Sequence, residues 1–245
     1  LTHLSKKSKF STLKRRIASI KVVHKIKGHY LDSKHPIIME NLLGIKRING
    51  SYQKPKKPLL INDLKNILKV IDEKENKEHK KIRNKSLILL GFAGGFRRSE
   101  LVNIEHGDLE FVNEGLKIFV KRSKTDQTGE GSIKAIPYFK NAEFCPVTKL
   151  NDWINYKDIK KGKVFKISDR SVALIIKKYA LLAGFDPDKY GGHSLRSGFA
   201  TSAAEAGAEE RNIMAMTGHK TTQMVRRYIQ EANLFKNNAL NKIKI

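Results

Sequence analysis

Between Asp108 and Phe139 the sequence changes from a helical to an alternating pattern of apolar residues, with helical patterns on both sides. Three short runs, LEFV, LKIFVKR and IKAIPYF, are rich in β-branched and aromatic residues, and turn-forming residues separate them at 113–115 and 126–131. These runs predict a small antiparallel sheet. Because the rest of the chain has helical spacing, we expect a mainly α-helical protein with one small antiparallel β-sheet, an α+β fold.

Apolar residues recur at helical spacing in ten further segments. Pro36 is a favoured first-turn residue, while Gly28, Gly50 and the pair Gly94-Gly95 mark helix ends. The expected helices cover about 11–27, 36–49, 62–71, 78–93, 147–157, 170–183, 194–206, 209–217 and 221–231, with a short helix beginning near residue 97.

The stretch SYQKPKKP at 51–58 is polar, basic and interrupted by proline, which is typical of a linker. We therefore predict a helical N-terminal domain at 1–52, a linker at 53–58 and a larger domain at 59–245. Two helices make only a thin core. Because the first residue is Leu1 and not Met, we expect the N-terminal segment to be the end of a longer helical domain.

The chain carries 49 Lys and Arg against 24 Asp and Glu, a formal net charge of +25. Residues 1–60 hold 15 of these bases and two acids, so they carry +13. Such a charge favours a polyanionic partner, most commonly nucleic acid, although a solvated lysine-rich surface is the alternative. The single cysteine, Cys145, excludes a disulfide framework and a Cys-based zinc site. With no run of 18 apolar residues we expect no membrane span, and we expect a cytoplasmic location.

The segment GGFRRSEL at 94–101 contains the first candidate functional residue, Arg97. Its glycines resemble a phosphate-binding loop, but the GK[ST] ending of a P-loop is absent. At the start of a helix, Arg97 can hold a phosphate through two hydrogen bonds, and Glu100 has a structural role in holding Arg97 or the helix start. The alternative is that Arg97 and Arg98 are surface charges.

The segment GGHSLR at 191–196 combines a histidine, an arginine and a predicted helix start. Two glycines allow the backbone to approach a ligand closely. We expect Ser194 to cap the helix, with His193 just outside it and Arg196 in its first turn. A turn histidine beside a solvated arginine is the alternative.

Two further segments carry candidate residues. His219 follows Thr217-Gly218, and Tyr228 comes nine residues later. Lys124 lies in the sequence SKTD at a predicted hairpin turn. Considered one at a time, each residue has an ordinary alternative explanation: His219 as a turn residue, Tyr228 as a core residue and Lys124 as a solvated surface lysine.

Together, these side chains form a set that handles a phosphodiester without a metal ion or other cofactor. Phosphoryl transfer mainly requires neutralisation of the equatorial phosphate oxygens, which Arg97 and Arg196 provide. His219 donates a hydrogen bond to a nonbridging oxygen.

The remaining members supply the proton transfers and the nucleophile. The hydroxyl of Tyr228 attacks phosphorus and forms a covalent intermediate. Because the ordinary pKa of tyrosine is about 10, it requires a proton acceptor, for which His193 is the candidate. Lys124 then protonates the departing 5′-oxygen.

The chain resembles the tyrosine recombinases, also called the phage integrase family, over about residues 57–235. The resemblance rests on a G-x-R-x-S-E-L box at 95–101, an S-K-T-D context at 123–126, an H-x-x-R box at 193–196, and T-G-H at 217–219 with a tyrosine nine residues after the histidine. It assigns catalytic roles to Arg97, Lys124, His193, Arg196, His219 and Tyr228.

The resemblance also implies a fold and partners. Segments 11–50 correspond to the last helices of the family's core-binding domain, so 1–52 would be a partial one. The family forms a clamp around double-stranded DNA, works as a homotetramer during strand exchange, and docks a C-terminal helix on a neighbouring protomer. The candidate docking residues are Ile229, Leu234, Phe235 and Leu240, and packing on the same domain is the alternative.

The function we expect is site-specific DNA recombination through a 3′-phosphotyrosyl intermediate, without metal or ATP, by a nucleoid-associated enzyme. One alternative is a type IB topoisomerase, which uses similar chemistry to relax supercoils. Another is a non-catalytic DNA-binding remnant.

Overall fold

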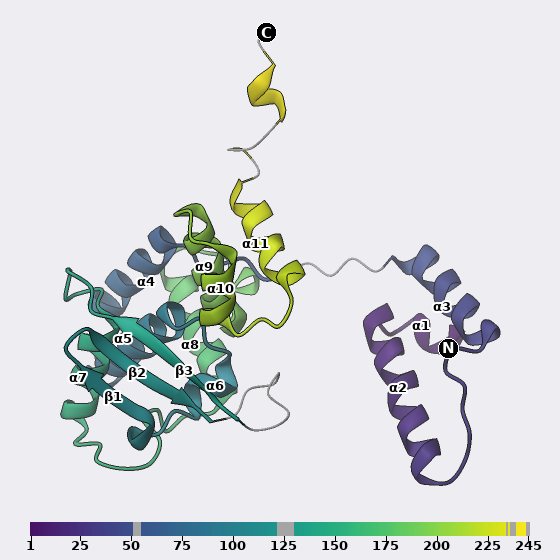
Figure 1. The fold of residues 1–245 in the computed structure, drawn as a ribbon, viewed down its shortest axis with the longest axis horizontal. Helices are drawn as coiled ribbons and strands as arrows, with labels where there is room; N and C mark the ends of the chain where they lie inside the picture. The colour runs from purple at the N-terminus through teal and green to yellow at the C-terminus, as the bar shows by residue number, and fades with distance from the viewer. Residues whose placement is uncertain (51–54, 122–129, 234, 236–238, 244–245) are drawn as a thin grey trace. The chain divides into compact units, whose positions relative to one another are not determined.

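The computed structural model describes residues 1–50, 55–121, 130–233, 235 and 239–243 (Figure 1). The chain divides into two compact units, Leu1–Pro55 and Lys56–Ile245. The division falls in the predicted linker at 53–58, of which residues 53 and 54 lie outside the described residues. The assignment of the first unit to a partial core-binding domain stays a prediction.

The first unit consists of helices around a small apolar cluster. Its elements are α1 (Thr2–Ser5), α2 (Phe10–Ile26) and α3 (Pro36–Asn49). The cluster consists of Leu13 and Ile17 from α2 with Leu42 and Ile45 from α3. The sequence pattern does not predict α1, none of whose side chains is buried.

In the second unit, helices precede and follow a three-stranded sheet along the chain, as the sequence predicts (Figure 1). Its elements are α4 (Ile61–Lys74), α5 (Glu78–Ala93), α6 (Arg98–Val102), η1 (His106–Asp108), β1 (Leu109–Val112), β2 (Gly115–Val120), β3 (Ser132–Pro137), α7 (Pro146–Tyr156), α8 (Asp169–Leu182), η2 (Pro187–Lys189), α9 (Gly192–Glu205), α10 (Glu210–Thr217), α11 (Thr222–Asn233) and η3 (Ala239–Lys242). The predicted α+β class is confirmed.

The sheet has the order β1-β2-β3 with antiparallel pairing throughout. Leu116 of β2 lies opposite Phe111 of β1 and Ile136 of β3. Gly115, at a φ of 158°, begins β2 at a point where a Cβ atom would lie 2.1 Å from the carbonyl oxygen of Ile136. The close pairing of β2 with β3 therefore requires glycine at this position.

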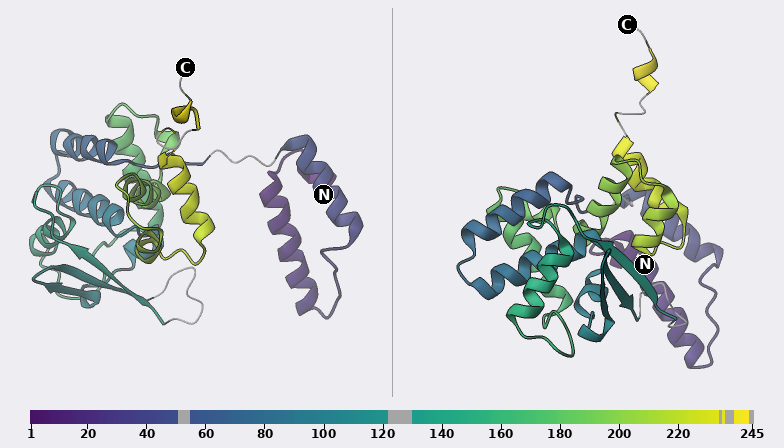
Figure 2. Two further views of the ribbon diagram at one scale, coloured as in Figure 1. Left: turned by 45° about the horizontal axis from the view of Figure 1, so that its top comes forward. Right: turned by 60° about the vertical axis from the view of Figure 1, so that its left-hand side comes forward.

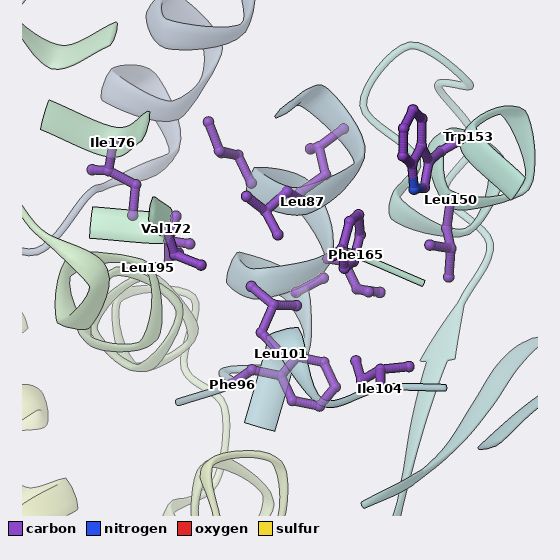
Figure 3. Packing of buried hydrophobic residues seen from close by; sticks show 14 of the residues in the cluster. Leu87, Phe96, Leu101, Ile104, Leu150, Trp153, Phe165, Val172, Ile176 and Leu195 are labelled. Carbon is purple, nitrogen blue, oxygen red and sulfur yellow. The ribbon is translucent and has the colours of Figure 1, made fainter. Parts of the chain in front are cut away.

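The core of the second unit is built around α5, which contacts α4, α6, α7 and α9. Residues 84–91 of this helix are all buried, as expected for a helix covered on all sides. Trp153 of α7 and Phe165 extend this core toward the sheet (Figure 3). The indole N–H of Trp153 donates to the carbonyl oxygen of Val164 at 3.0 Å, which satisfies its buried donor.

Helices α9, α10 and α11 pack together through a separate apolar cluster (Figure 2). The cluster consists of Ala200, Ala204, Ile213 and Val225, with Tyr228 and Ile229 packed against it. The alanines allow α11 to lie close to α9, so this cluster determines where Tyr228 is held.

Docking of the C-terminal segment on a neighbouring protomer stays a prediction. Ile229 packs on its own domain, whereas Phe235 and Leu240 are exposed; Leu234 lies outside the described residues. Within the described parts of the chain, no helix has the length and apolar character needed to cross a membrane.

Candidate active site

Arg97 is held by Glu100 at the start of α6. One carboxylate oxygen, Oε2, accepts from the backbone N–H of Arg97 at 2.9 Å, and Oε1 accepts from its Nη1 at 2.6 Å. Arg97 Nη2 lies 3.4 Å from the carbonyl oxygen of Gly218. Glu100 is buried, and it performs both structural tasks that the sequence predicts for it.

The neighbouring Arg98 occupies space created by a glycine. A Cβ atom on Gly192 would lie 1.9 Å from Cδ of Arg98, so the aliphatic part of this arginine packs directly on the glycine backbone. We expected the glycine pair at 191–192 to admit a ligand. Gly192 instead admits Arg98.

His193 and Arg196 both lie within α9, because this helix begins at Gly192. The expectation that Ser194 caps the helix, with His193 outside it, is wrong. The Oγ atom of Ser194 accepts from the backbone N–H of Gly191 at 3.0 Å, so the serine supports the helix start from inside the first turn.

Arg196 is one of the largest fully buried side chains among the described residues, with an exposed fraction of 1%. Its Nη1 donates to the carbonyl oxygen of Gly95 at 2.8 Å, whereas Nη2 has no hydrogen-bond partner among the described residues. Burial, followed by the charge of Arg97, lowers the pKa of Arg196 to about 10, so it is still charged near pH 7. A buried, charged donor without a partner is costly unless an anion binds it.

His219 follows a left-handed glycine. Gly218, with a φ of 62°, ends α10 and reverses the chain. The buried ring is oriented by Thr217, whose Oγ1 lies 2.8 Å from Nδ1. Burial is the main cause that lowers the pKa of His219 to about 4, with Arg196 and Arg97 adding to it. The ring is therefore neutral at pH 7.

Tyr228, on α11, meets His193. The distance between Tyr228 Oη and His193 Nε2 is 3.3 Å, and the rings of Tyr228 and His219 are 6.0 Å apart between centroids. Although His193 borders solvent, partial desolvation lowers its pKa, and the charges of Arg196, Arg97 and Arg98 lower it further. A neutral imidazole at this distance can accept the phenolic proton.

The two histidines and the arginines line one open groove with a volume of about 640 Å³, and Tyr228 adjoins this groove through its contact with His193. Its described lining consists of Arg97, Arg98, Ser99, Asp169, Gly192, His193, Arg196, His219, Lys220, Thr221 and Met224. The lining therefore contains three arginines and a lysine but only one carboxylate, Asp169, so its net charge is positive. The arrangement fits a phosphate-bearing ligand.

The sequence profile of the phage integrase family matches residues 58–234. The chain belongs to the phage integrase family.

An integrase/recombinase xerD homolog of Selenomonas ruminantium is 40% identical over 258 aligned residues, which cover 99% of this chain and 75% of the relative. A crystal structure of the XerH site-specific recombinase bound to difH substrate covers 91% of this chain and 67% of its own, with a TM-score of 0.60 and 19% identity. The Tn1549 transposon integrase in complex with a circular intermediate DNA gives a TM-score of 0.64 at 16% identity, covering 95% and 81%. At these identities, the two structures establish the shared fold.

The family profile and the named relatives identify the enzyme as a tyrosine recombinase. They support a site-specific recombinase and neither a type IB topoisomerase nor a non-catalytic remnant.

Of the six residues predicted for the site of this recombinase, five lie around the groove: Arg97, His193, Arg196, His219 and Tyr228. Lys124 lies outside the described residues. No group of three or more His, Cys, Asp or Glu side chains within the described ranges is arranged to hold a metal ion.

Lys134 on β3 is a buried lysine beside the recombinase site that the sequence motifs do not predict. A signal for it was present, because alternation along β3 places Lys134 on the same face as the buried Ile136. Its partners could not be found in this way, since they lie 40 and 82 residues away in the sequence.

Proposed function

We propose that this recombinase cleaves and rejoins double-stranded DNA at a specific site through a 3′-phosphotyrosyl bond to Tyr228, without a metal ion or ATP. One observation carries the proposal. The Tyr228 hydroxyl lies 3.3 Å from a histidine nitrogen at a groove lined by Arg196, whose buried Nη2 has no hydrogen-bond partner among the residues that the structure describes.

The two arginines bind the scissile phosphate. Arg196 offers its Nη2 and Arg97 offers a guanidinium whose position Glu100 fixes. Both charges act where negative charge builds up on the nonbridging oxygens during phosphoryl transfer. With the Thr217 hydroxyl donating to Nδ1, the neutral ring of His219 carries its proton on Nε2 and donates it to one of these oxygens.

The covalent step begins when Oη of Tyr228 attacks phosphorus and its proton passes to Nε2 of His193. The bond between phosphorus and the 5′-oxygen breaks, and Lys124 gives that oxygen a proton. The role of Lys124 rests on its sequence context. The products are a 3′-phosphotyrosine and a free 5′-hydroxyl.

Rejoining reverses these steps with a 5′-hydroxyl from the partner strand as the nucleophile. One phosphodiester bond is replaced by a phosphotyrosyl bond and then by another phosphodiester bond, so no ATP is consumed. Exchange of both strands between two duplexes involves four scissile phosphates and, with one Tyr228 per protomer, a homotetramer on DNA. Action on DNA also places the enzyme at the nucleoid.

The charge distribution supports duplex DNA as the partner. The net charge of +25 favours a polyanion, and half of it belongs to the first 60 residues. Binding of the N-terminal unit to duplex DNA would add affinity to that of the groove.

The test is to trap the covalent intermediate. The full chain is incubated in EDTA with nicked duplexes tiled across the DNA that flanks its own gene, so that the short 5′-hydroxyl fragment diffuses away after cleavage. We expect a denaturation-resistant protein–DNA adduct that disappears in Tyr228→Phe. DNA binding by this variant should change little.

Tyr156→Phe is the matched control, because Tyr156 is an exposed tyrosine on α7 that lines no part of the groove. It should form the adduct as wild type does. An adduct that persists in Tyr228→Phe, or wild-type protein that binds the duplexes without forming any adduct, would contradict the proposal.

A further inference from the structure

Lys134 is a buried lysine that forms two hydrogen bonds to the backbone beside the active site. The residue is 5% exposed, and its Nζ donates to the carbonyl oxygen of Gly94 at 2.7 Å and to that of Met216. The ammonium also lies over the ring of Phe96, 4.7 Å from its centroid. No carboxylate is paired with it among the described residues.

The two carbonyl groups belong to the two segments that carry the phosphate-binding side chains. Gly94 precedes Gly95, whose carbonyl oxygen accepts from Arg196, and Arg97 follows two residues later. Met216 lies in the last turn of α10, three residues before His219. A single ammonium group therefore joins the segment before α6 to the end of α10.

The segment before α6 and the end of α10 are packed closely against each other. Gly95 has a φ of 53°, and a Cβ atom on it would lie 3.2 Å from Phe199 and 3.2 Å from Thr217. Arg97 reaches across the same contact toward the carbonyl oxygen of Gly218. A change in the separation of the segments would therefore move Arg97, Arg196 and His219 relative to one another.

A lysine suits this position because its compact ammonium group has three hydrogens and can donate to two converging carbonyl groups while facing a ring. An apolar side chain of the same length would fill the space but leave both carbonyl groups unpaired. Burial lowers the pKa of Lys134 to about 8, while the charge of Glu100 opposes this shift. The protein thus maintains a buried cation whose charged form is costly.

We propose that Lys134 is a positioning residue for cleavage, which fixes the distance between the segment bearing Arg97 and the turn bearing His219 so that both meet one phosphate. This inference rests on the proposed function. It gives Lys124 and Lys134 different roles: Lys124 protonates the leaving oxygen, and Lys134 acts through the groups it holds.

The test compares Lys134→Met with wild type in single-turnover cleavage at saturating DNA. A displacement of about 1 Å in a catalytic group can cost up to about 100-fold in rate, so we expect the cleavage rate constant to fall about 10- to 100-fold. The DNA dissociation constant should stay within about threefold, because most phosphate contacts are untouched. Lys117→Met is the matched control, since Lys117 is a partly exposed lysine on β2 that pairs with Glu110, and it should cleave at the wild-type rate.

A second substrate distinguishes positioning from proton donation. In a duplex with sulfur in place of the 5′ bridging oxygen, the leaving thiolate needs no proton, because thiol pKa values of about 8–9 are far below those of alcohols. This substrate should restore cleavage by Lys124→Ala but not by Lys134→Met. Restoration of Lys134→Met would show that Lys134 is the proton donor and would overturn the inference.

Folding is checked by circular dichroism and thermal unfolding of each variant. If Lys134→Met does not fold, the cleavage rate of Lys134→Gln is measured instead. The glutamine side chain is shorter than lysine, so its amide can form a good hydrogen bond to only one of the two carbonyl groups. A folded Met or Gln variant that cleaves at the wild-type rate would overturn the inference. If wild-type protein forms no Tyr228 adduct, the proposed function itself fails, and this result is distinct from equal rates in wild type and variant.

Discussion

The Oη atom of Tyr228 on α11 lies 3.3 Å from the Nε2 atom of His193 in the first turn of α9. The residues are 35 positions apart in the sequence. Their approach depends on the packing of α11 against α9 through Ala200 and Val225, both fully buried. The groups proposed as nucleophile and base are therefore set at hydrogen-bonding distance by helix packing.

Replacing either arginine of the groove should slow cleavage strongly. We expect Arg97→Ala and Arg196→Ala each to reduce the rate of adduct formation by about two to three orders of magnitude, because each removes a donor to the charge that develops on phosphate. The measurement is the rate of adduct formation on a nicked duplex, with Arg170→Ala on α8 as a control outside the groove lining. Wild-type rates in either variant would exclude that arginine from the site.

The pH dependence of cleavage should report the protonation of His193. The pKa of this ring is lowered below its usual value of 6.5, and only the neutral ring can accept the proton of Tyr228. The second-order rate constant for adduct formation should thus be level near pH 7 and fall at pH values below the lowered pKa.

His193→Gln tests the origin of this acid limb, since glutamine keeps a hydrogen-bonding side chain but cannot take up a proton at these pH values. We expect a slow enzyme whose rate no longer falls with acid in that range. His79→Gln, at the start of α5, should keep the wild-type profile. An unchanged acid limb in His193→Gln would assign the titration to another group.

Glu75 should make stability depend on pH. Its carboxylate accepts from Lys178 Nζ and from the buried Tyr179 hydroxyl, both at 2.6 Å, and these bonds lower its pKa from 4.5 to about 2. A lowered folded-state pKa stabilises the fold above the unfolded-state value, and this stabilisation is lost as pH falls from about 4.5 toward 2. The shift corresponds to at most about 3 kcal/mol.

Urea unfolding at several pH values measures this effect. Glu75→Gln should lower the free energy of unfolding at pH 7 and flatten its decrease between pH 5 and pH 2. The matched variant Glu73→Gln removes a half-exposed carboxylate in the last turn of α4, the helix that ends just before Glu75; it lies 3.8 Å from Lys69 and should alter stability little. If the free energy of unfolding depends on pH in the same way in both variants, the hydrogen bonds of Glu75 contribute no net stability.

Gly198 should not tolerate alanine, although it lies inside α9. Alanine normally stabilises a helix by about 1 kcal/mol relative to glycine. A Cβ atom at Gly198, however, would lie 2.0 Å from the carbonyl oxygen of Leu59, whose N–H donates to Ser194. We expect Gly198→Ala to lower the free energy of unfolding by about 1–3 kcal/mol.

Gly44→Ala provides the contrast, because nothing lies within 4 Å of a Cβ atom at this glycine of α3. Amide hydrogen exchange should show slower exchange in α3 of this variant. A Gly198→Ala protein as stable as wild type would show that Leu59 moves aside at little cost.

Local patterns were sufficient to predict the long elements. The helices at 78–93 and 209–217 and the three strands were predicted to within a residue or two, since periodicity and glycine breaks act over short stretches. The start of α9 was predicted wrongly because Ser194 is a good capping residue, and the close contact between Gly192 and Arg98 cannot be read from neighbours in the sequence.

The sequence alone determined the α+β class, the strong positive charge and the motifs that show family membership, because each is a property of composition or short-range order. The tertiary structure decided which side chains meet. Arg196 is buried with one nitrogen that has no partner in the described parts of the chain, His219 is held neutral by burial and by two arginines, and Lys134 reaches two backbone segments. These properties arise from desolvation and from contacts between residues 40 to more than 100 positions apart, which depend on how the helices and the sheet pack.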